Sequence, residues 1–563
     1  MKSAGIMATQ VVKQISESKI VSGELVRMTQ HNASTTADAR TISATHLNAL
    51  MSSDYVYALI DVREAGEYNS SHIPASSLIS RRDLEIQMAG SVHHKGIHII
   101  VCDDDGRRAD LAAGTLRRMG YTNVSALDGG MNQWVVEKFP TEWGVNVPSK
   151  DYGEKMQVQH HVPEITATDL NQRIENGDKL VILDTRTPEE YQRACIPGGR
   201  SIPGGELSLR ITDITSQLDD DTTVVVNCAG RTRSIIGTRV LQRMGLTNVF
   251  GLENGTAGWV LAGLELETGG DRLELPELSP EGIAAAEQYA DTLATEDGVK
   301  FLDIPGLYAM IGRQSAENIY LIDVRTEGEY KAGHIPGFRW FPGGQAVQRS
   351  DEVGVVHNCP IVFTCDSKAR AVQTASMYRQ MGHKEVYAVD GGTSAWESAG
   401  AELESGMPAT APDGFAEAVL QAKHISAHEL ESDSQITKIF VDPSQDFAWG
   451  HALGAHWIPR GWLELRIEAT APDKSAPLTV TCRDGVQSTL AAATLSELGY
   501  SDVSVLNGGM AAWLESGLPV EKGLSGVMSI PTDVLPMGPD RNFADMVNYL
   551  RWEEELGHKY ETG

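Results

Sequence analysis

The segment VVVNCAGRTRSIIGTRVLQRMGLTNVFGLENGTAGW, at residues 224–259, decides the fold. It predicts a buried strand, a polar loop that begins at Cys228, a helix, a second strand, and a glycine turn before Trp259. The same pattern recurs at residues 99–134, 361–396 and 478–513. A repeat of roughly a hundred residues or more is a domain rather than a solenoid unit, so we expect four related domains.

The loop cysteine keeps a fixed register in three of the copies. Cys228 stands 17 residues before Gly245 and 27 residues before Gly255, and Cys365 and Cys482 keep both spacings to their own glycines. A cysteine on a strand-to-helix loop is well placed to act as a nucleophile, because the loop and the helix N-terminus can stabilise its thiolate.

The first copy departs from this register. The same steps back from Gly120 and Gly130 reach Asp103, one residue after Cys102. Either that loop holds one extra residue, or Cys102 ends the strand and an aspartate occupies the nucleophile position. Because both glycines give the same offset, we favour the second interpretation, and we expect the first domain to be inactive.

A second block precedes each loop and completes the fold class. It consists of a short apolar strand that ends at an aspartate, the start of a helix, and a turn of the His-Ile-Pro-Gly type, which Pro keeps extended. The four copies occupy residues 58–76, 181–199, 320–338 and, in divergent form, 439–459. Alternating strands and helices predict an α/β fold, in which each domain is a parallel sheet flanked by helices.

These motifs resemble the rhodanese family. The Asp-x-Arg strand end, the turn before the second strand, the Cys-x-x-x-x-Arg loop and the Asp-Gly-Gly-x-x-x-Trp close all match it, and the chain is similar to bacterial proteins with four tandem rhodanese domains. The resemblance implies a thiosulfate sulfurtransferase. A loop cysteine would take sulfane sulfur from a small anionic donor such as thiosulfate, hold it as a persulfide, and pass it to cyanide or a thiol.

The gaps between copies suggest the domain boundaries. Residues 145–162 are interpreted as a polar linker, and residues 281–294 as a helix that leads into the third domain. The expected parts are an N-terminal extension at 1–40, rhodanese-like domains at 41–145, 162–268, 281–404 and 422–522, and a C-terminal tail with a short helix at 523–563. We expect this helix to dock on a domain or on a second subunit, which would make a homodimer.

Composition limits the partners. The 563 residues carry a net charge of −29, which argues against nucleic acid or an anionic membrane, since both need a basic surface. No secretory signal or membrane span is evident, and six cysteines without paired spacing suit a reducing compartment, so we expect a cytoplasmic protein. His160 and His161 are interpreted as exposed linker residues, and we expect no metal or cofactor.

Local charge ranks the loops. The Cys228 loop carries two arginines and no acid, the Cys365 loop has one net positive charge, and the Cys482 loop is neutral, with Gln487 in place of the loop-ending arginine. Cys228 is therefore the expected persulfide nucleophile, Cys365 a possible second one, and Cys482 a weak candidate. The residues expected to bind substrate are Ala229, Gly230, Arg231, Thr232, Arg233, Ser234 and Arg186.

The remaining cysteines have simpler interpretations. Cys102 and Cys359 are expected to be buried packing residues. Cys195 stands where two other copies have His72 and His334, and it is interpreted as a packing residue or as a resolving thiol for Cys228.

Two other function classes stay open. One is a cysteine-dependent phosphatase or arsenate reductase, although family resemblance gives those loops one more residue before the arginine; here Arg233 follows Cys228 by five positions. The other is a non-catalytic sulfur carrier or scaffold, because the first and fourth copies look degenerate.

Overall fold

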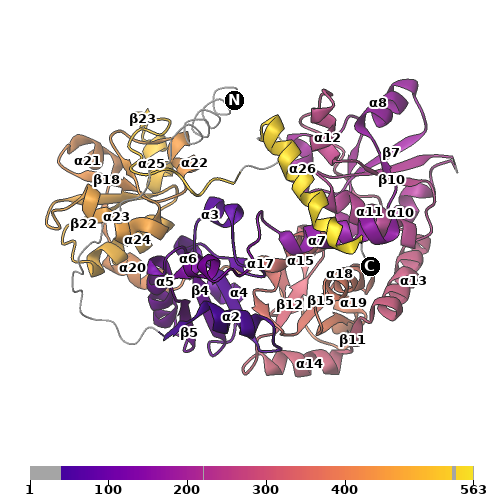
Figure 1. Ribbon diagram of the computed structural model, residues 1–563, viewed down its shortest axis with the longest axis horizontal. Coiled ribbons are helices and arrows are strands. Elements are labelled where there is room, and N and C mark those ends of the chain that lie inside the picture. The colour runs from indigo at the N-terminus through magenta and orange to yellow at the C-terminus, as the bar shows by residue number, and fades with distance from the viewer. Residues whose placement is uncertain (1–39, 220, 536–540, 562–563) are drawn as a thin grey trace. The chain divides into compact units, whose positions relative to one another are not determined.

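The computed structural model describes residues 40–219, 221–535 and 541–561, and it divides into two compact units (Figure 1). In the described residues, the first unit holds the second domain, at 150–283, together with residues 541–561 of the tail. The second unit holds the first, third and fourth domains, at 40–149 and 284–535. The N-terminal extension predicted at 1–40 lies outside the described residues except for Arg40.

The second domain and the tail helix belong to the first unit. Their elements are α7 (Val147–His160), β6 (Glu164–Ile165), α8 (Ala167–Asn176), β7 (Leu180–Asp184), α9 (Pro188–Arg193), β8 (Arg200–Ser201), η2 (Gly204–Glu206), α10 (Leu207–Thr215), β9 (Thr223–Asn227), α11 (Thr232–Arg243), β10 (Val249–Leu252), α12 (Gly255–Leu261), α26 (Phe543–Gly557) and η5 (His558–Tyr560). The first three residues of α7 fall in the other unit.

The first domain opens the second unit. Its elements are β1 (Arg40–Ile42), α2 (Ala44–Met51), β2 (Tyr57–Asp61), α3 (Ala65–Ser70), β3 (Ser77–Leu78), η1 (Arg81–Asp83), α4 (Leu84–Ser91), β4 (His98–Cys102), α5 (Arg107–Arg118), β5 (Val124–Leu127) and α6 (Gly130–Val136).

The third and fourth domains complete it, apart from residues 280–283 at the start of the third, which fall in the first unit. The third has α13 (Pro280–Asp297), β11 (Lys300–Leu302), α14 (Ile304–Arg313), β12 (Tyr320–Asp323), α15 (Glu327–Ala332), β13 (Arg339–Trp340), α16 (Gly343–Gln348), α17 (Ser350–Val353), β14 (Val356–His357), β15 (Ile361–Thr364), α18 (Ala369–Gln380), β16 (Val386–Val389) and α19 (Gly392–Ser398). The fourth has α20 (Phe415–Gln421), β17 (Lys423–Ile425), α21 (Ala427–Ser432), β18 (Thr437–Phe440), α22 (Ser444–Trp449), β19 (His451–Ala452), β20 (His456–Trp457), η3 (Arg460–Trp462), α23 (Leu463–Thr470), β21 (Leu478–Thr481), α24 (Val486–Glu497), β22 (Val503–Leu506), α25 (Gly509–Glu515) and β23 (Val520–Glu521).

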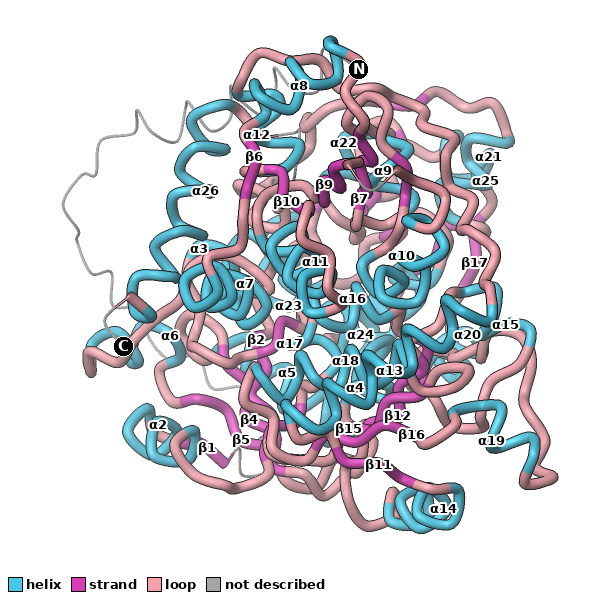
Figure 2. Tube along the Cα trace, turned by 90° about the vertical axis from the view of Figure 1, so that its right-hand side faces the viewer, coloured by secondary structure: helices cyan, strands magenta, loops and turns pink. Residues whose placement is uncertain are grey.

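Each domain is built on a parallel sheet with one common strand order. The orders are β1-β5-β4-β2-β3, β6-β10-β9-β7-β8, β11-β16-β15-β12-β13 and β17-β22-β21-β18-β20. Helices cover both faces; in the third domain, for example, the strands lie between α14 on one side and α16 and α18 on the other (Figure 2). The predicted α/β class with four flanked parallel sheets is therefore confirmed.

Burial and capping explain why these segments form. The central strands are mostly apolar and almost entirely buried, as expected for parallel strands that are covered on both faces. Capping boxes start the helix after the first long strand: Thr187 with Glu190 in α9, and Thr326 with Glu329 in α15. Gly255 has φ +53°, and a Cβ atom there would lie 2.3 Å from the carbonyl oxygen of Cys228, so only glycine lets the turn approach the loop.

Residues 145–162 were predicted as a polar linker, which is wrong. They contain the helix α7, whose Tyr152 and Met156 are buried four positions apart. The helix has few apolar residues, so its sequence shows only a weak helical periodicity. Its stability therefore depends on contacts with the domain that follows. The helix predicted at 281–294 is confirmed as α13, which runs three residues further.

The fourth copy of the strand-ending motif is also different from the prediction. Phe440 pairs with Thr481 in the register in which Asp323 pairs with Thr364, so Phe440 replaces the strand-ending aspartate. Asp442 then occupies the arginine position of Asp-x-Arg. The aspartate visible in the sequence is shifted by two residues, so the fourth domain lacks the buried ion pair of the others.

Within the second unit, the domains share direct contacts. Strand β14 of the third domain pairs antiparallel with β2 of the first domain. The 3-10 helices η1 and η3 face each other, and Arg460 forms an ion pair with Glu85 while Arg81 forms one with Glu464. These contacts join the first domain to both the third and the fourth.

We predict that Asp323→Asn destabilises the third domain by about 3–5 kcal/mol, because Arg325 would keep a buried charge without its counter-ion. Native-state hydrogen exchange of the β12 and β15 amides in the full chain measures this loss. Glu327→Gln is the matched control: Glu327 forms an exposed ion pair with Lys331, and its loss should cost less than about 1 kcal/mol. Equal effects of the two substitutions would contradict the structural role of the buried pair.

Candidate active site

Cys228 begins the loop between β9 and α11, at the carboxyl ends of the parallel strands, where α/β folds place their ligands. It lies four positions before the first residue of its helix, as do Cys365, Cys482 and Asp103. The carbonyl of each of these four residues also accepts a hydrogen bond from the turn that follows; for Cys228 the donor is the N–H of Thr256, at 2.9 Å.

In the first domain the structure places Asp103, not Cys102, in the nucleophile position. Cys102 is the last residue of β4, and its side chain is fully buried. Burial, followed by the charge of Asp61, raises the pKa of the Cys102 thiol well above its ordinary value. The carboxylate of Asp103 accepts hydrogen bonds from the N–H groups of Gly106 (2.5 Å) and Arg108 (2.8 Å). The register expected from the glycine spacings is confirmed.

The Cys228 side chain is buried, with 2% of the residue exposed. Its thiol lies 3.5 Å from Oγ of Ser234, and that hydroxyl donates to the carbonyl of Arg231 (2.7 Å). Burial raises the pKa of Cys228 above its ordinary value, against the lowering effects of Arg233, Ser234 and the Gly230 amide. The loop groups lower the thiol pKa, as expected, but desolvation outweighs them, so the net shift at Cys228 is upward.

The loop-ending arginine is held by a glutamate from another helix. Arg233 makes two hydrogen bonds to the carboxylate of Glu190, at 2.7 and 2.9 Å, and this ion pair lowers the pKa of Glu190 to about 2. Equivalent pairs join Arg370 to Glu329 and Arg108 to Glu67. Each of these glutamates is also the third residue of a capped helix. This glutamate was not among the predicted site residues, although it follows the strand-ending aspartate by six positions in all three domains, which is a signal that the sequence contains.

The second loop arginine is also paired. Arg231 is buried and bonds to Glu154 of α7 at 2.9 Å, with Glu554 of α26 at 3.3 Å and Glu164 at 3.9 Å. The two positive charges counted along the Cys228 loop are thus offset by acids that come from elsewhere in the chain. Glu154 and Glu554 were not among the predicted site residues.

The other predicted substrate-binding residues surround Cys228 in different ways. The carbonyl of Ala229 accepts from the N–H of Ala257, and the Gly230 amide lies beside the thiol. Thr232 begins α11, where its backbone and methyl group pack against Gly153 of α7.

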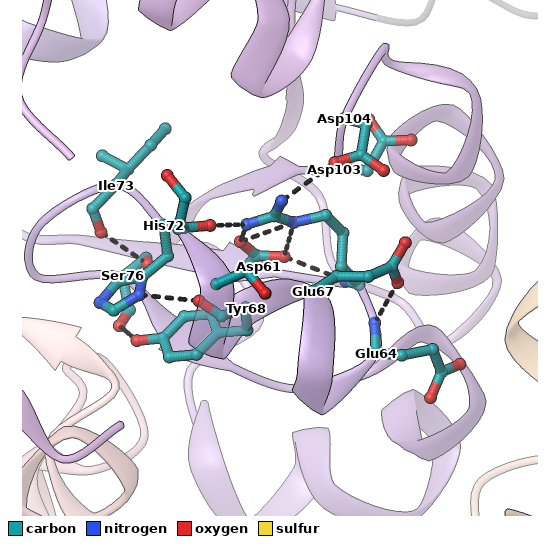
Figure 3. A network of polar contacts seen from close by, with 12 residues as sticks. Asp61, Glu64, Glu67, Tyr68, His72, Ile73, Ser76, Asp103 and Asp104 are labelled. Carbon is teal, nitrogen blue, oxygen red and sulfur yellow. Dashed lines mark hydrogen bonds and ion pairs between the residues drawn. The ribbon is translucent and has the colours of Figure 1, made fainter. Parts of the chain in front are cut away.

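Arg186 lies at the strand end and ties two segments together. It forms a bidentate pair with Asp184 and donates to the carbonyl of Ala194 at 2.5 Å. The first domain repeats this arrangement around Asp61, as Figure 3 shows, and there Nη1 of Arg63 reaches Asp104 on the loop at 3.0 Å. Ala229 stands at the Asp104 position in the second domain, and among the described residues Nη1 of Arg186 accordingly makes no hydrogen bond.

Cys365 lies in a more acidic setting. Burial raises its pKa to about 12, and the charge of Asp366 acts in the same direction, ahead of the lowering effect of Arg370. Lys368 points instead to Asp291 of α13, at 2.7 Å. Ala371 replaces the serine found six positions after Cys228, so the hydroxyl is absent.

The Cys482 loop is well formed although its charges are unfavourable. The Cys482 sulfur accepts from the N–H groups of Gly485 (3.0 Å) and Ser488 (3.3 Å). Burial and then Asp442 raise its pKa to about 11. Gln487, which replaces the loop-ending arginine, bonds to Arg460 at 2.6 Å and to the carbonyl of Arg82 at 3.2 Å. That position therefore serves the packing of the fourth domain against the first.

Cys195 and Cys359 lie in packed surroundings outside the loops. Cys195 pairs through its backbone with Glu267 and packs beside Tyr191. Its neighbours favour the packing role over the resolving role that was also considered. The thiol of Cys359 bonds to the carbonyl of Val356 at 3.1 Å.

Comparison with known proteins agrees with this geometry. A family model described as the rhodanese-like domain matches residues 43–137, 166–262, 306–399 and 426–516. The crystal structure of a thiosulfate sulfurtransferase from Pseudomonas aeruginosa superposes with a TM-score of 0.84 at 34% identity, covering 93% of this chain and 98% of that one.

Curated relatives match over shorter stretches. A thiosulfate sulfurtransferase of Azotobacter vinelandii is 24% identical over 239 residues, which is 36% of this chain and 87% of the relative. A Bacillus subtilis protein that bears the name "Putative sulfur carrier protein YrkF" is 31% identical over 98 residues, which is 17% of this chain and about half (51%) of the relative. No helix within the described ranges has the length and apolar character needed to cross a membrane. The four domains that match the family model, together with the similarity to the P. aeruginosa structure over nearly the whole chain, show that the chain belongs to the rhodanese family and is a rhodanese-type sulfurtransferase.

Proposed function

We propose that the chain is a thiosulfate sulfurtransferase that works through a persulfide on Cys228. The thiolate attacks the outer sulfur of thiosulfate, the S–S bond breaks, and sulfite leaves with the electron pair. Cyanide or a thiol then attacks the outer sulfur of the persulfide and releases the Cys228 thiolate. Family membership and the P. aeruginosa structure support the reaction class.

One observation carries the choice of Cys228: the largest charge effect on its thiol is favourable. Arg233 lowers the pKa of Cys228, whereas the leading charge effect raises the pKa at Cys365, through Asp366, and at Cys482, through Asp442. All three thiols are buried, so desolvation raises the pKa of each and does not distinguish them. The sign of the nearest charge distinguishes Cys228 from the other two.

The backbone of the loop supports the handling of a sulfur anion. The Asp103 carboxylate in the first domain and the Cys482 sulfur in the fourth both accept loop N–H groups at the nucleophile position. These amides form an anion-binding concavity of the kind found at helix N-termini. The Cys228 loop occupies the equivalent place in the second domain, so we infer that it forms the same concavity around a Cys228 persulfide. The residues of this concavity are Ala229, Gly230, Arg231, Thr232, Arg233 and Ser234. Arg233 and Ser234 position the persulfide, and Nη1 of Arg186 is available to an oxyanion.

The other domains fit a carrier or scaffold role. Asp103 cannot form a persulfide, and in the fourth domain Asp442 stands at the arginine position of the strand-ending motif. The resemblance to the YrkF carrier supports such a role for part of the chain. The short loop, with arginine five positions after cysteine, supports sulfur over a phosphate or arsenate group. Six free cysteines are consistent with the cytoplasmic address that we propose.

We predict that Cys228→Ser lowers thiosulfate:cyanide transfer by on the order of 10³-fold or more, because serine cannot carry the sulfur. Intact mass after thiosulfate treatment should show one added sulfur in the parent protein and none in the variant. Cys365→Ser and Cys482→Ser are the matched controls and should keep most of the activity. Loading that survives Cys228→Ser would move the site to another domain.

The reactivity of Cys228 should follow its raised pKa. We predict that its alkylation by iodoacetamide rises with pH to a midpoint above 9.0, the ordinary value for a thiol. Arg233→Ala should slow the reaction at pH 8, because losing the cation raises the pKa further and each unit removes about nine-tenths of the thiolate. Arg173→Ala, which alters an arginine bonded to the opposite end of β9, should leave the rate unchanged. A midpoint below 9 would contradict the dominance of burial.

Cys102 should be inert. Its side chain is buried behind Asp103, and both burial and nearby acids disfavour its thiolate. We predict that native-state alkylation with peptide mapping labels it far more slowly than Cys228, and that it carries no sulfur after thiosulfate. Labelling of the two cysteines at equal rates would mean that the first domain holds a live site.

A further inference from the structure

The tail helix α26 belongs to the first unit, where Figure 1 shows it beside α7, and it packs directly on the Cys228 loop. The position that a Cβ atom would take on Gly230 lies 3.1 Å from Oε2 of Glu553 and 3.7 Å from both Cδ2 of Leu550 and Cε1 of Tyr549. Gly230 is the second residue after Cys228. The helix therefore supplies one wall of the site, from residues far away in the sequence.

Several contacts hold α26 in this place. Its C-terminal end is fixed by Lys559 and Tyr560, which both bond to Asp151 of α7. In the middle of α26, the Lys150 ammonium group lies over the rings of Tyr549 and Trp552. These contacts show that the helix is packed against the domain as part of its structure.

Glu554 of this wall bonds to Arg231 of the loop, and Glu553 faces Gly230. Glu553 is 2% exposed, and its Oε1 accepts a hydrogen bond from the Tyr549 hydroxyl at 2.7 Å. Burial and the adjacent Glu553 raise the pKa of Tyr549 well above its ordinary value, so the phenol stays protonated and donates. Oε2, the atom aimed at Gly230, is buried and has no hydrogen-bond partner among the described residues. A buried oxygen in this state is costly until a donor reaches it.

Acids and cations both lie near Glu553. Glu154, Glu164 and Glu554 lie close together around the single guanidinium of Arg231. Burial, and then the charges of Glu253, Glu154 and Glu554, raise the pKa of Glu164 to about 7, so this group is about half ionised at neutral pH. Lys150 and Arg541 add two positive charges beside Tyr549, so acids and cations nearly balance in the wall as a whole. The group that faces Gly230 is the Glu553 carboxylate, and a carboxylate in this place repels an anionic substituent and attracts a cationic one.

We propose that Glu553 makes the Cys228 site selective for amino thiols as sulfur acceptors, with Oε2 receiving the ammonium group of the acceptor. This inference rests on the proposed persulfide on Cys228. In the transfer, the acceptor sulfur bonds to the outer sulfur of the persulfide, and the bond between the two persulfide sulfurs breaks. Cys228 leaves and takes up the proton that the acceptor thiol loses. The products are an acceptor persulfide and the free Cys228 thiol, so no external oxidant or reductant is needed.

The test uses the full-length chain loaded with sulfur from thiosulfate, with loading measured by intact mass. Single-turnover transfer is then followed to cysteamine, which is cationic, and to 3-mercaptopropionate, an anionic thiol of similar size. The two thiols differ in intrinsic reactivity, so the quantity compared is the change in their rate ratio between proteins. Glu553→Gln should lower the preference for cysteamine by on the order of tenfold. Glu553→Asp keeps the charge and should retain most of the preference.

Glu555→Gln is the matched control, because Glu555 is exposed on the same helix and loses the same charge. It should leave the ratio unchanged. If the variants load sulfur normally, either of two results would overturn the proposal. One is an unchanged rate ratio in Glu553→Gln, and the other is a shift of the same size in Glu555→Gln. Failure of the parent protein to load would instead overturn the proposed function on which the inference rests. Thermal unfolding and loading stoichiometry show whether each variant is folded.

Discussion

The ion pair between the loop-ending arginine and the glutamate of the first capped helix is the interaction on which the site depends. In the second domain it joins Arg233 to Glu190, and it recurs at Arg108 and at Arg370. The glutamate also caps its own helix, so one carboxylate fixes the start of that helix and the end of the loop. The arginine is largely buried and the glutamate partly exposed, and their two parallel hydrogen bonds fix the end of the Cys228 loop. In the fourth domain, Gln487 bonds to Arg460 instead, and the loop amides still face the Cys482 sulfur.

The four domains show what happens when the loop chemistry changes on a constant scaffold. The sheet order, the glycine turn and the position four residues before the helix are kept in every copy. In the first domain the ion pair survives although Asp103 has replaced the nucleophile. In the fourth the nucleophile survives, while Gln487 has replaced the arginine and bonds toward the first domain. The fold has therefore been kept while the nucleophile and the loop-ending arginine have changed independently of each other. This agrees with the proposal that one domain is catalytic and that others act as carrier or scaffold.

The sequence predicted the fold class and the position of the loop residues well, because both are encoded locally. Glycines at fixed spacing located Asp103, and apolar runs located the central strands. Charges could not be predicted in the same way: Glu190, Glu154 and Glu554 approach the Cys228 loop from three separate helices. The pKa direction at Cys228 was missed for a related reason, since burial depends on the whole packed domain. Helix α7 was missed because few of its residues are apolar.

The acidity of the chain fits with sulfur chemistry once the range of each interaction is considered. Both arginines of the Cys228 loop are paired with carboxylates, so the loop presents little net positive charge. What remains for a sulfur anion is the set of backbone N–H groups, which act over hydrogen-bond distances and need no counter-ion. The carboxylates on α26 lie further from the sulfur than these N–H groups, and their charges act on the part of an acceptor molecule that lies beyond its thiol. Binding of the sulfur and choice of the acceptor can therefore depend on different parts of the domain: the loop for the first and the tail helix for the second.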